Sequence, residues 1–518
     1  MFTRKLFIQK ILATILILLY LPAVVLASPV QAGTPQADFS AVDAYVEAQR
    51  EALGIPGMAV AIVQGDQVAY LGSYGEAGKD RPVTPQTPFQ IGSLTKSFTA
   101  LAVMQLVEAG KVELDTPVQT YIPWFRTADE TASAQITVRH LLNQTSGFST
   151  SAGRDEFAAS DLSDQAIENS VRILADVALV HTPGTEYEYS NVNYNILGYI
   201  VQVVSGQSYE SYMQENVFGP LEMRHSFTSQ TLAVQDGLST GYVTFLGFPV
   251  ARETPFNCGN LPNGYQFSSA EDLAHHLIAQ LNEGRYGDTS VVSPQGMTAM
   301  HEPAAPMGTL GEYYAMAWKI GDSEGTPVIY HSGDNANFAT HILMVPQEKL
   351  GVAVLINVNG YGVNSAPTQI ADGVMAILRG AQPNPYQKYQ QVYLAEGSGI
   401  VPALIALLWI GWMAFRFVRR QKRPAPARRG FAFWTWVIVV PVLVDIVLLG
   451  ILLLGIPTLW ELPLNGIAQM FPDYFILIAG SALALAVWGV LRTVLTLRQP
   501  GAMQSSAGRL GEASAAHL

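Results

Sequence analysis

Cysteine is almost absent from this chain of 518 residues, in which Cys258 is the only one. A lone cysteine excludes an intrachain disulfide and therefore a disulfide-stapled scaffold, although it assigns no cellular compartment. Charged residues are also scarce, since Asp, Glu, Lys and Arg make up 14% of the sequence and leave a net charge of −12. So little charge in so long a chain is typical of a protein with membrane segments rather than of one large soluble enzyme.

Signals for nucleotides, nucleic acids and metals are missing between residues 33 and 397. This region contains no phosphate-cradling glycine-rich loop and no basic patch, which disfavours nucleotide and nucleic-acid binding. His275 and His276 are adjacent, whereas two zinc ligands on one helix face are typically four residues apart. We therefore expect no metal, no cofactor and no nucleic-acid partner.

The N-terminus has the layout of a secretory signal. Basic residues within positions 4–10 precede the apolar run Ile11–Leu26, and small residues follow at Ala27 and Ala32. This pattern predicts a signal peptide over residues 1–32, cleaved after Ala27 or Ala32, with an uncleaved signal anchor as the alternative. In either case the chain from about residue 33 onward is exported.

Three further apolar runs lie near the C-terminus: Ile400–Val418, Phe431–Ile456 and Tyr474–Leu491. Each reaches the roughly 18–20 residues that a membrane-spanning helix needs. Residues 400–498 are therefore predicted to form three transmembrane helices in the cell membrane, with the bilayer as a partner and a tail at 499–518.

The connectors between these runs predict the orientation. Arg419–Arg429 carries six basic residues and no acid, whereas Pro457–Asp473 carries two acids and no base. The tail restarts with Arg492 and Arg498. By the positive-inside rule the first connector and the tail face the cytoplasm, and residues 33–397 lie outside the membrane.

Asp445 lies inside the second apolar run. A carboxylate within the membrane is costly and is a functional candidate by default. A contact between helices is the alternative role for Asp445. Arg416 lies near the cytoplasmic end of the first run, where its long side chain can reach the interface.

Residues 33–380 have the composition of one globular domain, followed by a linker at 381–399 rich in Gln, Tyr, Pro and Gly. Apolar spacing and capping residues predict helices at Phe39–Leu53, Leu94–Gly110, Val138–Leu142, Asp164–Val180, Asn193–Ser205, Ala270–Leu281 and Pro367–Leu378. β-Branched and alternating segments predict a hairpin over Gly57–Tyr74 and strands at Pro327–His331, His341–Val345 and Gly351–Asn357. We expect an α/β fold of the α+β kind, in which the first and last segments close one antiparallel sheet flanked by helices. The helical middle would form an all-α lobe, with the active cleft between the two.

Ser93 and Lys96 stand at the head of the apolar stretch Ser93–Val107. Residues three apart on a helix share a face, so Lys96 can reach the Ser93 hydroxyl. Serine is a poor nucleophile at its own pKa and needs a neighbour that accepts its proton. A helix start also favours nearby negative charge. Taken alone, the pair also fits a helix-starting serine with a solvated lysine.

Tyr189 and Asn191 follow in a Y-x-N tripeptide. A tyrosine phenol can act as a base only beside a cation that stabilises the phenolate, and Lys96 could be that cation. Asn191 offers an amide that can hold both Lys96 and a substrate carbonyl. The alternative is a loop of turn-forming residues that leads into the next helix.

His331, Ser332 and Gly333 end the predicted strand Pro327–His331. Small residues here would let a substrate lie against the strand edge. The backbone N–H groups of Asp334 and Ser93 would then form an oxyanion hole. A strand end with a turn glycine is the simpler alternative for this segment.

The ordered motifs S-x-x-K, Y-x-N and H-x-G together resemble the class C β-lactamase-like serine hydrolases of the penicillin-binding-protein superfamily. The segments Thr137–Gly147, Pro183–Asn191, Asn263–Gly264 and Ser268–Leu273 are similar to that family as well. The resemblance covers about residues 38–380. It implies that Ser93 is acylated, that Lys96 and Tyr189 together are the base for acylation, and that Tyr189 then protonates the leaving group and activates the deacylating water. It places Asn191 and the segment His331–Asp334 at the substrate.

His331 departs from the family pattern, because β-lactamases and transpeptidases usually carry lysine there. An unperturbed histidine is half charged near pH 6.5 and mostly neutral above it, so carboxylate recognition is weakened. A histidine at this position resembles the esterase, D-amino-peptidase and other peptidase branches of the family, which implies a hydrolase of esters or peptides, including D-amino-acid or cell-wall substrates, with weak β-lactamase activity at most. The alternatives are a penicillin-recognising sensor that stays acylated and a non-catalytic wall-associated scaffold.

Overall fold

The computed structural model describes residues 39–153, 160–323, 325–360, 362–384, 390–422 and 430–498. The predicted signal peptide, the tail 499–518 and part of the predicted linker lie outside these residues. Helix α13 (Gln390–Gln421) begins inside the segment 381–399 that the sequence suggested as a linker.

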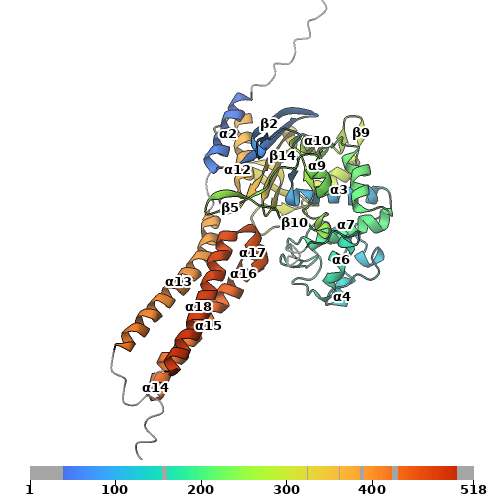
Figure 1. The fold of residues 1–518 in the computed structure, drawn as a ribbon. Coiled ribbons are helices and arrows are strands. Elements are labelled where there is room, and N and C mark those ends of the chain that lie inside the picture. The colour runs from blue at the N-terminus through green and yellow to red at the C-terminus, as the bar shows by residue number, and fades with distance from the viewer. Residues whose placement is uncertain are drawn as a thin grey trace, which may run out of the picture. The chain divides into compact units, whose positions relative to one another are not determined.

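A nine-stranded antiparallel sheet carries the globular part (Figure 1). Its strands are, in spatial order, β10 (Ala305–Pro306), β11 (Tyr313–Tyr314), β12 (Lys319–Ser323), β13 (Thr326–Asn335), β14 (Phe338–Val345), β15 (Leu350–Ile356), β1 (Gly57–Gln64), β2 (Gln67–Gly78) and β3 (Arg81–Pro82). β1 pairs with β15 in the register Met58 to Ile356, so the first and last segments close the sheet as predicted. Gly65, with φ of 65°, forms the turn of the β1–β2 hairpin.

Helices cover both faces of this sheet. Helix α10 (Ala270–Leu281) packs on β15, where Gly351 meets Leu277. Helix α12 (Ala366–Leu378) packs on β14, where Thr368 lies 3.2 Å from His341, and α2 (Ser40–Leu53) packs on α12. His341 pairs with Val354 and therefore shares its face of the sheet. Val354 is three positions from Gly351 on β15, and residues an odd number of positions apart point to opposite faces. Helices α10 and α12 therefore cover opposite faces of the sheet. Accordingly every residue of β14 and β15 is buried.

A helical lobe forms the rest of the globular part. The helices of this lobe and of its border are α3 (Thr95–Glu108), α4 (Glu130–Ser133), α5 (Val138–Leu142), α6 (Ala166–Arg172), α7 (Val192–Ser205), α8 (Tyr209–Met213), α9 (Gln230–Gln235) and α11 (Pro294–His301). Helix α3 is buried on nearly all sides and packs against α7. Three short sheets consist of β4 (Phe89–Gln90) with β7 (Phe267–Ser268), β5 (Tyr242–Phe245) with β6 (Phe248–Ala251) and β16 (Val358–Asn359), and β8 (Arg285–Tyr286) with β9 (Thr289–Ser290).

Three helices near the C-terminus are long and apolar enough to cross a bilayer. They cover Gly397–Gln421, Phe431–Leu459 and Pro472–Arg498, with 25, 29 and 27 residues. The first belongs to α13 and the third is α18 (Pro472–Arg498). The second runs through α14 (Phe431–Trp434), α15 (Val440–Gly450) and α16 (Ile456–Leu459), joined by π-helical turns, and α17 (Leu464–Met470) follows it.

Asp445 joins these helices. Its Oδ2 lies 2.7 Å from Nη2 of Arg492, and its Oδ1 accepts a hydrogen bond of 2.8 Å from Trp409 Nε1. Both partners of the ion pair are buried. Asp445 therefore makes contacts between helices, which was the alternative role predicted for it.

Arg492 lies inside helix α18 and within the predicted helical range 400–498, although it was also counted among the basic residues on the cytoplasmic side. Helix α18 continues to Arg498, and Arg492 is only 2% exposed. The carboxylate of Asp445 makes this possible, because a buried cation requires a partner. A single sequence gives no sign that the two residues meet.

Two predicted elements also differ. The helix expected over Asp164–Val180 is only α6 with a 3₁₀ turn at Ile173–Asp176, after which Val177 is extended. There the backbone bonds to other segments, as in Ala128 N–H to Val177 O at 3.0 Å. Strand β13 does not end near His331 but continues to Asn335.

Candidate active site

Ser93 lies in a 3₁₀ turn, Gly92–Leu94, that leads directly into α3. Gly92 has φ of 54°, and a Cβ atom there would lie 2.5 Å from the backbone nitrogen of Asp334. Only glycine allows so close an approach in this conformation. Strand β13 therefore runs directly past the turn that carries Ser93.

Lys96 is buried completely, one helical turn after Ser93. Its Nζ lies 3.0 Å from Ser93 Oγ, 2.8 Å from Asn191 Oδ1 and 2.7 Å from the backbone oxygen of Asn263. An ammonium group has three donors, and three acceptors stand around it. The sequence motifs brought forward Asn191 but assigned no role to Asn263, whose backbone oxygen has no side-chain signature.

Tyr189 approaches Ser93 from the loop before α7. Its hydroxyl donates a hydrogen bond of 2.8 Å to Ser93 Oγ, and Lys96 Nζ lies 5.0 Å from the centroid of its ring. The Ser93 hydroxyl thus has two proton-exchanging groups within reach. This is the geometry in which a serine hydroxyl can be deprotonated during attack on an acyl carbon.

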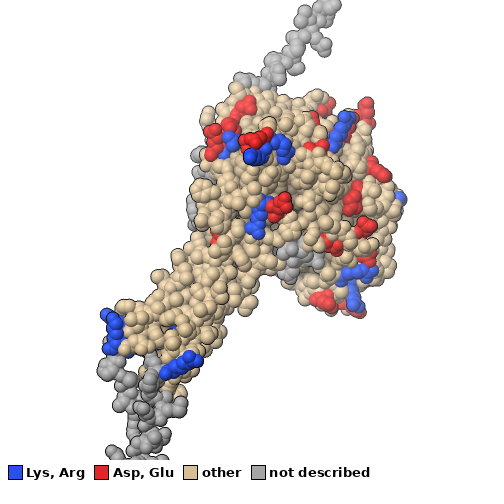
Figure 2. Space-filling view, viewed as in Figure 1, with Lys and Arg blue, Asp and Glu red and all other residues tan. Residues whose placement is uncertain are grey.

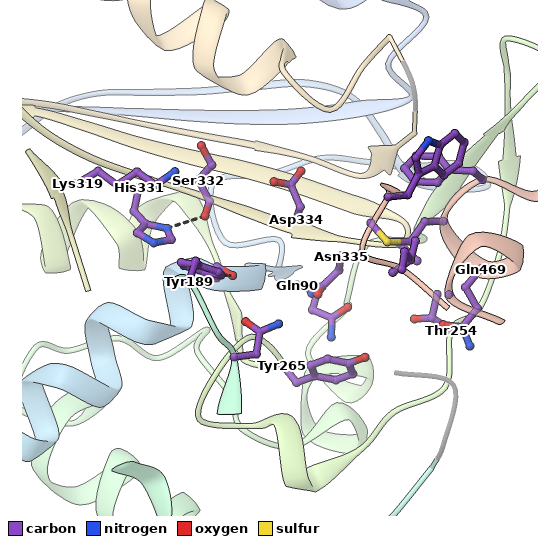
Figure 3. A pocket seen from close by; sticks show the side chains of 18 of the residues that line it. Gln90, Tyr189, Thr254, Tyr265, Lys319, His331, Ser332, Asp334, Asn335 and Gln469 are labelled. Carbon is purple, nitrogen blue, oxygen red and sulfur yellow. Dashed lines mark hydrogen bonds between the residues drawn. The ribbon is translucent and has the colours of Figure 1, made fainter. Parts of the chain in front are cut away.

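His331 is buried and neutral. Its Nδ1 lies 2.7 Å from the backbone oxygen of Ser332 (Figure 3), and its Nε2 lies 3.4 Å from the hydroxyl of Tyr314. Burial, and next the positive charges of Lys319 and Lys96, hold the pKa of His331 well below its usual value. The side chain is therefore neutral at pH 7, more firmly than an unperturbed histidine would be.

Gly333 and Asp334 continue the strand beside Ser93. A Cβ atom at Gly333 would lie 2.0 Å from the backbone oxygen of Ile91, so this position admits only glycine. The Asp334 side chain lies 3.3 Å from Asn359 Nδ2, and burial raises its pKa to about 6. Ser332 lies 2.9 Å from His341 Nδ1.

A cavity of about 450 Å³ opens over these groups (Figure 3). From the globular part it is lined by Gln90, Ser93, Tyr187, Tyr189, Asn191, Thr254, Tyr265, Lys319, His331, Ser332 and Asp334–Ala336. The predicted site residues with side chains on this cavity are thus Ser93, Tyr189, Asn191, His331, Ser332 and Asp334. Across the part of the chain that the structure describes, no cluster of three His, Cys, Asp or Glu residues could hold a metal ion.

Lys319 is a residue of the cavity that the sequence analysis missed. It opens β12, where it pairs with Tyr330 of β13, the residue before His331. Burial lowers the pKa of Lys319, while Asp334 and Glu312 act in the opposite direction. Strand β12 carries little apolar alternation, so no pattern in the sequence indicated this strand or the cation at its start.

Comparison with known proteins decides the family. Residues 42–374 match the protein family described as Beta-lactamase. The chain belongs to the Beta-lactamase family. Proteins of this family are in general serine hydrolases, and the nine-stranded sheet with its helical lobe is the family's fold.

Individual members of the family are moderately similar to the chain. Protein flp of Staphylococcus aureus (strain MW2) is 31% identical over 322 residues, which cover 61% of this chain and 63% of that protein. The chain therefore spans somewhat less than two thirds of that relative's length. Penicillin-binding protein 4 of Amycolatopsis lactamdurans is 31% identical over 320 residues, covering 58% of this chain and 81% of the relative.

Two solved structures share the fold. The octameric penicillin-binding protein homologue from Pyrococcus abyssi aligns with a TM-score of 0.60 at 30% identity, covering 69% of this chain and 80% of that one. A class C beta-lactamase aligns with a TM-score of 0.56 at 22% identity, covering 67% and 97%. The second likeness concerns the fold alone.

Proposed function

We propose that the chain is a membrane-anchored, extracytoplasmic serine hydrolase that cleaves esters or amides through an acyl-enzyme on Ser93. The observation that carries this proposal is the position of Ser93 Oγ, which lies 3.0 Å from Lys96 Nζ and 2.8 Å from the Tyr189 hydroxyl. Ser93 and Tyr189 line a cavity large enough for a small substrate, and Lys96 lies buried directly behind Ser93.

In the proposed reaction Ser93 Oγ attacks the carbonyl carbon of the substrate and loses its proton to the Lys96–Tyr189 pair. The pair titrates as a unit, so the proton belongs to both groups together. The oxyanion that forms is held by the backbone N–H groups of Ser93 and Asp334. Tyr189 then returns the proton to the leaving group, which departs as an alcohol or amine. Water, deprotonated by the same pair, hydrolyses the Ser93 ester and restores the hydroxyl.

The neutral His331 supports a substrate preference away from β-lactams. A lysine at this position would be a permanent cation for the carboxylate that β-lactams carry, whereas a buried neutral imidazole only donates or accepts hydrogen bonds. We therefore propose ester and peptide substrates, including D-amino-acid or cell-wall peptides, and weak β-lactam hydrolysis at most.

The distribution of basic residues supports the proposed orientation. Arg419 and Arg420 lie in the last turn of α13 and Arg498 in the last turn of α18. Figure 2 shows basic side chains at one end of the helical bundle and an uncharged surface along most of its visible length. By the positive-inside rule, this distribution supports the proposal that this end faces the cytoplasm and that the globular part lies outside.

Covalent labelling tests the proposal. The full chain in detergent micelles is incubated with a fluorophosphonate, and its intact mass is recorded for wild type, Ser93→Ala and Ser211→Ala, a control at an exposed serine of α8. We expect one adduct in wild type and in the control, and none in Ser93→Ala. An unlabelled wild type that is nevertheless folded would contradict the proposal. A penicillin adduct that forms and is never hydrolysed would favour the sensor alternative.

A further inference from the structure

The active-site cavity has a second wall that comes from the membrane region. The connector between the second and third apolar helices, residues 460–471, contains α17. Trp460, Leu462, Gly466, Gln469, Met470 and Phe471 of this connector line the same cavity as Ser93 and Tyr189. Figure 3 shows Gln469 at the opposite side of the cavity from Lys319 and His331. The cavity is therefore complete only when the membrane region is present.

Specific contacts hold the connector in place. Arg252 Nη1 of the globular part donates a hydrogen bond of 2.9 Å to the backbone oxygen of Ala468. Trp460 Nε1 donates to Ser398 Oγ of α13 at 2.7 Å, and its ring packs edge-on against Phe471. The connector is thus attached both to the domain that carries Ser93 and to the first apolar helix.

The two walls differ in chemistry. The side of the globular part offers hydroxyl, amide and charged groups, among them Asn191, Gln90 and Lys319. The connector offers mainly hydrocarbon, thioether and aromatic surface from Trp460, Leu462, Met470 and Phe471. Such a wall favours an apolar group of a substrate, because contact with it removes apolar surface from water.

The cavity also lies close to the expected bilayer surface. The connector joins two apolar helices, so it stands where they leave the membrane. The turn of the β5–β6 hairpin is attached at the start of α18, where Leu246 N–H donates to Asp473 Oδ2 at 3.2 Å. This hairpin exposes large apolar side chains, since Leu246 is 71% and Phe248 72% exposed. Exposed apolar groups beside a membrane helix fit a surface that rests on lipid.

We propose that the connector 460–471 forms an apolar subsite of the active site. The substrate is then an amphiphile with an apolar chain on its acyl group or on its leaving group. This substrate enters the cavity from the outer membrane surface. The inference rests on the proposed function of Ser93. It also gives the three apolar helices a task beyond anchoring, because they place one wall of the site.

Ester hydrolysis by the full chain in lipid nanodiscs tests the inference. One substrate series is the 4-nitrophenyl esters of acetic, butyric, octanoic and dodecanoic acid, and the other is the acetates of alcohols of matching lengths. We expect kcat/KM to rise with chain length in one series, by about tenfold or more between the ends, because each further methylene removes more apolar surface from water. Met470→Gln and Leu462→Asn keep side-chain size but add polarity to the connector wall, so they should remove most of this rise with chain length.

Leu232→Asn, on the exposed face of α9, is the matched control and should keep the full rise. Fluorophosphonate labelling of Ser93 is measured in every variant, which separates a misfolded site from an altered subsite. Flat chain-length profiles in both series with intact labelling would overturn the apolar subsite and leave the proposed function standing. Connector variants that retain the full rise would overturn the subsite as well. Loss of labelling in wild type would overturn the proposed function itself.

Discussion

At the scale of single residues, Lys319 changes the electrostatics of the site. The family pattern places a cation at the position of His331, and here the cation comes from the neighbouring strand β12. Lys319 lines the same cavity as His331 and contributes to the lowered pKa of that histidine. A positive charge thus lies in the cavity on strand β12 rather than in the H-x-G motif, so it would meet a substrate carboxylate at a different place from a lysine at position 331.

Lys319→Gln tests the role of this charge. We expect kcat/KM for an ester with a carboxylate beside the acyl group to fall about tenfold, about 1.4 kcal/mol, because a charge-assisted contact is lost. A neutral ester of the same size should be hydrolysed at the wild-type rate. Lys111→Gln, at an exposed lysine, is the control, and an equal loss on both esters would contradict a charge-specific role for Lys319.

His276 makes the stability of the globular part depend on pH. It is fully buried, its Nε2 lies 3.0 Å from Ser97 Oγ, and burial lowers its pKa to about 3. The unfolded chain protonates this histidine below about pH 6.5, while the folded chain keeps it neutral. The contribution of His276 is present above that pH, and it is lost as the pH falls towards 3.

The variant His276→Gln should be less stable than wild type at neutral pH, and this difference in the free energy of unfolding should shrink in acid. The free energy of unfolding of wild type, relative to this variant, should decrease by up to about 1.4 kcal/mol per pH unit below pH 6.5. Thermal unfolding of both proteins at a series of pH values measures the difference. Taking that difference removes the opposite effect of Asp272 and Asp372, whose pKa burial raises to about 6 in both proteins. A difference that does not change with pH would contradict the prediction.

At the scale of elements, the length of β13 shapes the site. Because the strand continues to Asn335, His331, Ser332, Gly333 and Asp334 all lie within a paired strand. Thr340 of β14 donates a hydrogen bond of 2.8 Å to the backbone oxygen of Ile91. The sheet and the segment that leads into the Ser93 turn are thereby joined by a side-chain hydroxyl of β14 and a backbone oxygen.

Gly333→Ala should disrupt this junction. Its Cβ atom would collide with Ile91 O, so we expect a loss of about 2 kcal/mol or more in the free energy of unfolding, together with loss of Ser93 labelling. Gly321→Ala on the adjacent strand β12 is the matched control, because its nearest neighbour would lie at an ordinary 3.4 Å. Equal stabilities of the two variants would show that β13 can move away from the turn.

At the scale of the whole molecule, one buried ion pair links the apolar helices. Asp445 of α15 contacts Arg492 of α18 and Trp409 of α13, so three separate helices meet at one carboxylate. These helices also hold the connector that lines the active-site cavity. Bundle stability and substrate access are therefore expected to be connected.

Asp445→Leu should destabilise the bundle strongly, because it leaves Arg492 buried without its counter-charge, at a cost of about 3–5 kcal/mol. The double variant Asp445→Leu with Arg492→Leu should recover most of the loss. Thermal unfolding of the full chain in detergent micelles measures both. If the single and the double variants were equally destabilised, the ion pair itself would not be what stabilises the bundle.

Local patterns in the sequence predicted much of this architecture. The bounds of α5 and α10 agree with the predicted helices, and Ser269 caps α10. The three apolar runs agree with the three long apolar helices. These features depend on short-range sterics, capping and the apolar content of neighbouring residues, which a single sequence contains. The three motifs also indicated which residues to compare with a family of known fold.

Tertiary structure alone decided how distant parts meet. The helical segment that begins with α6 stops before Val177, whose backbone bonds to Ala128 instead. Lys319 lies beside β13, the strand that carries His331, and Arg492 is buried against Asp445. Tertiary structure also brought the connector 460–471 to the cavity of Ser93, more than three hundred residues away along the chain. Such contacts depend on packing and on the pairing of buried polar groups. Those forces act between surfaces that exist only after folding, so no local pattern records them.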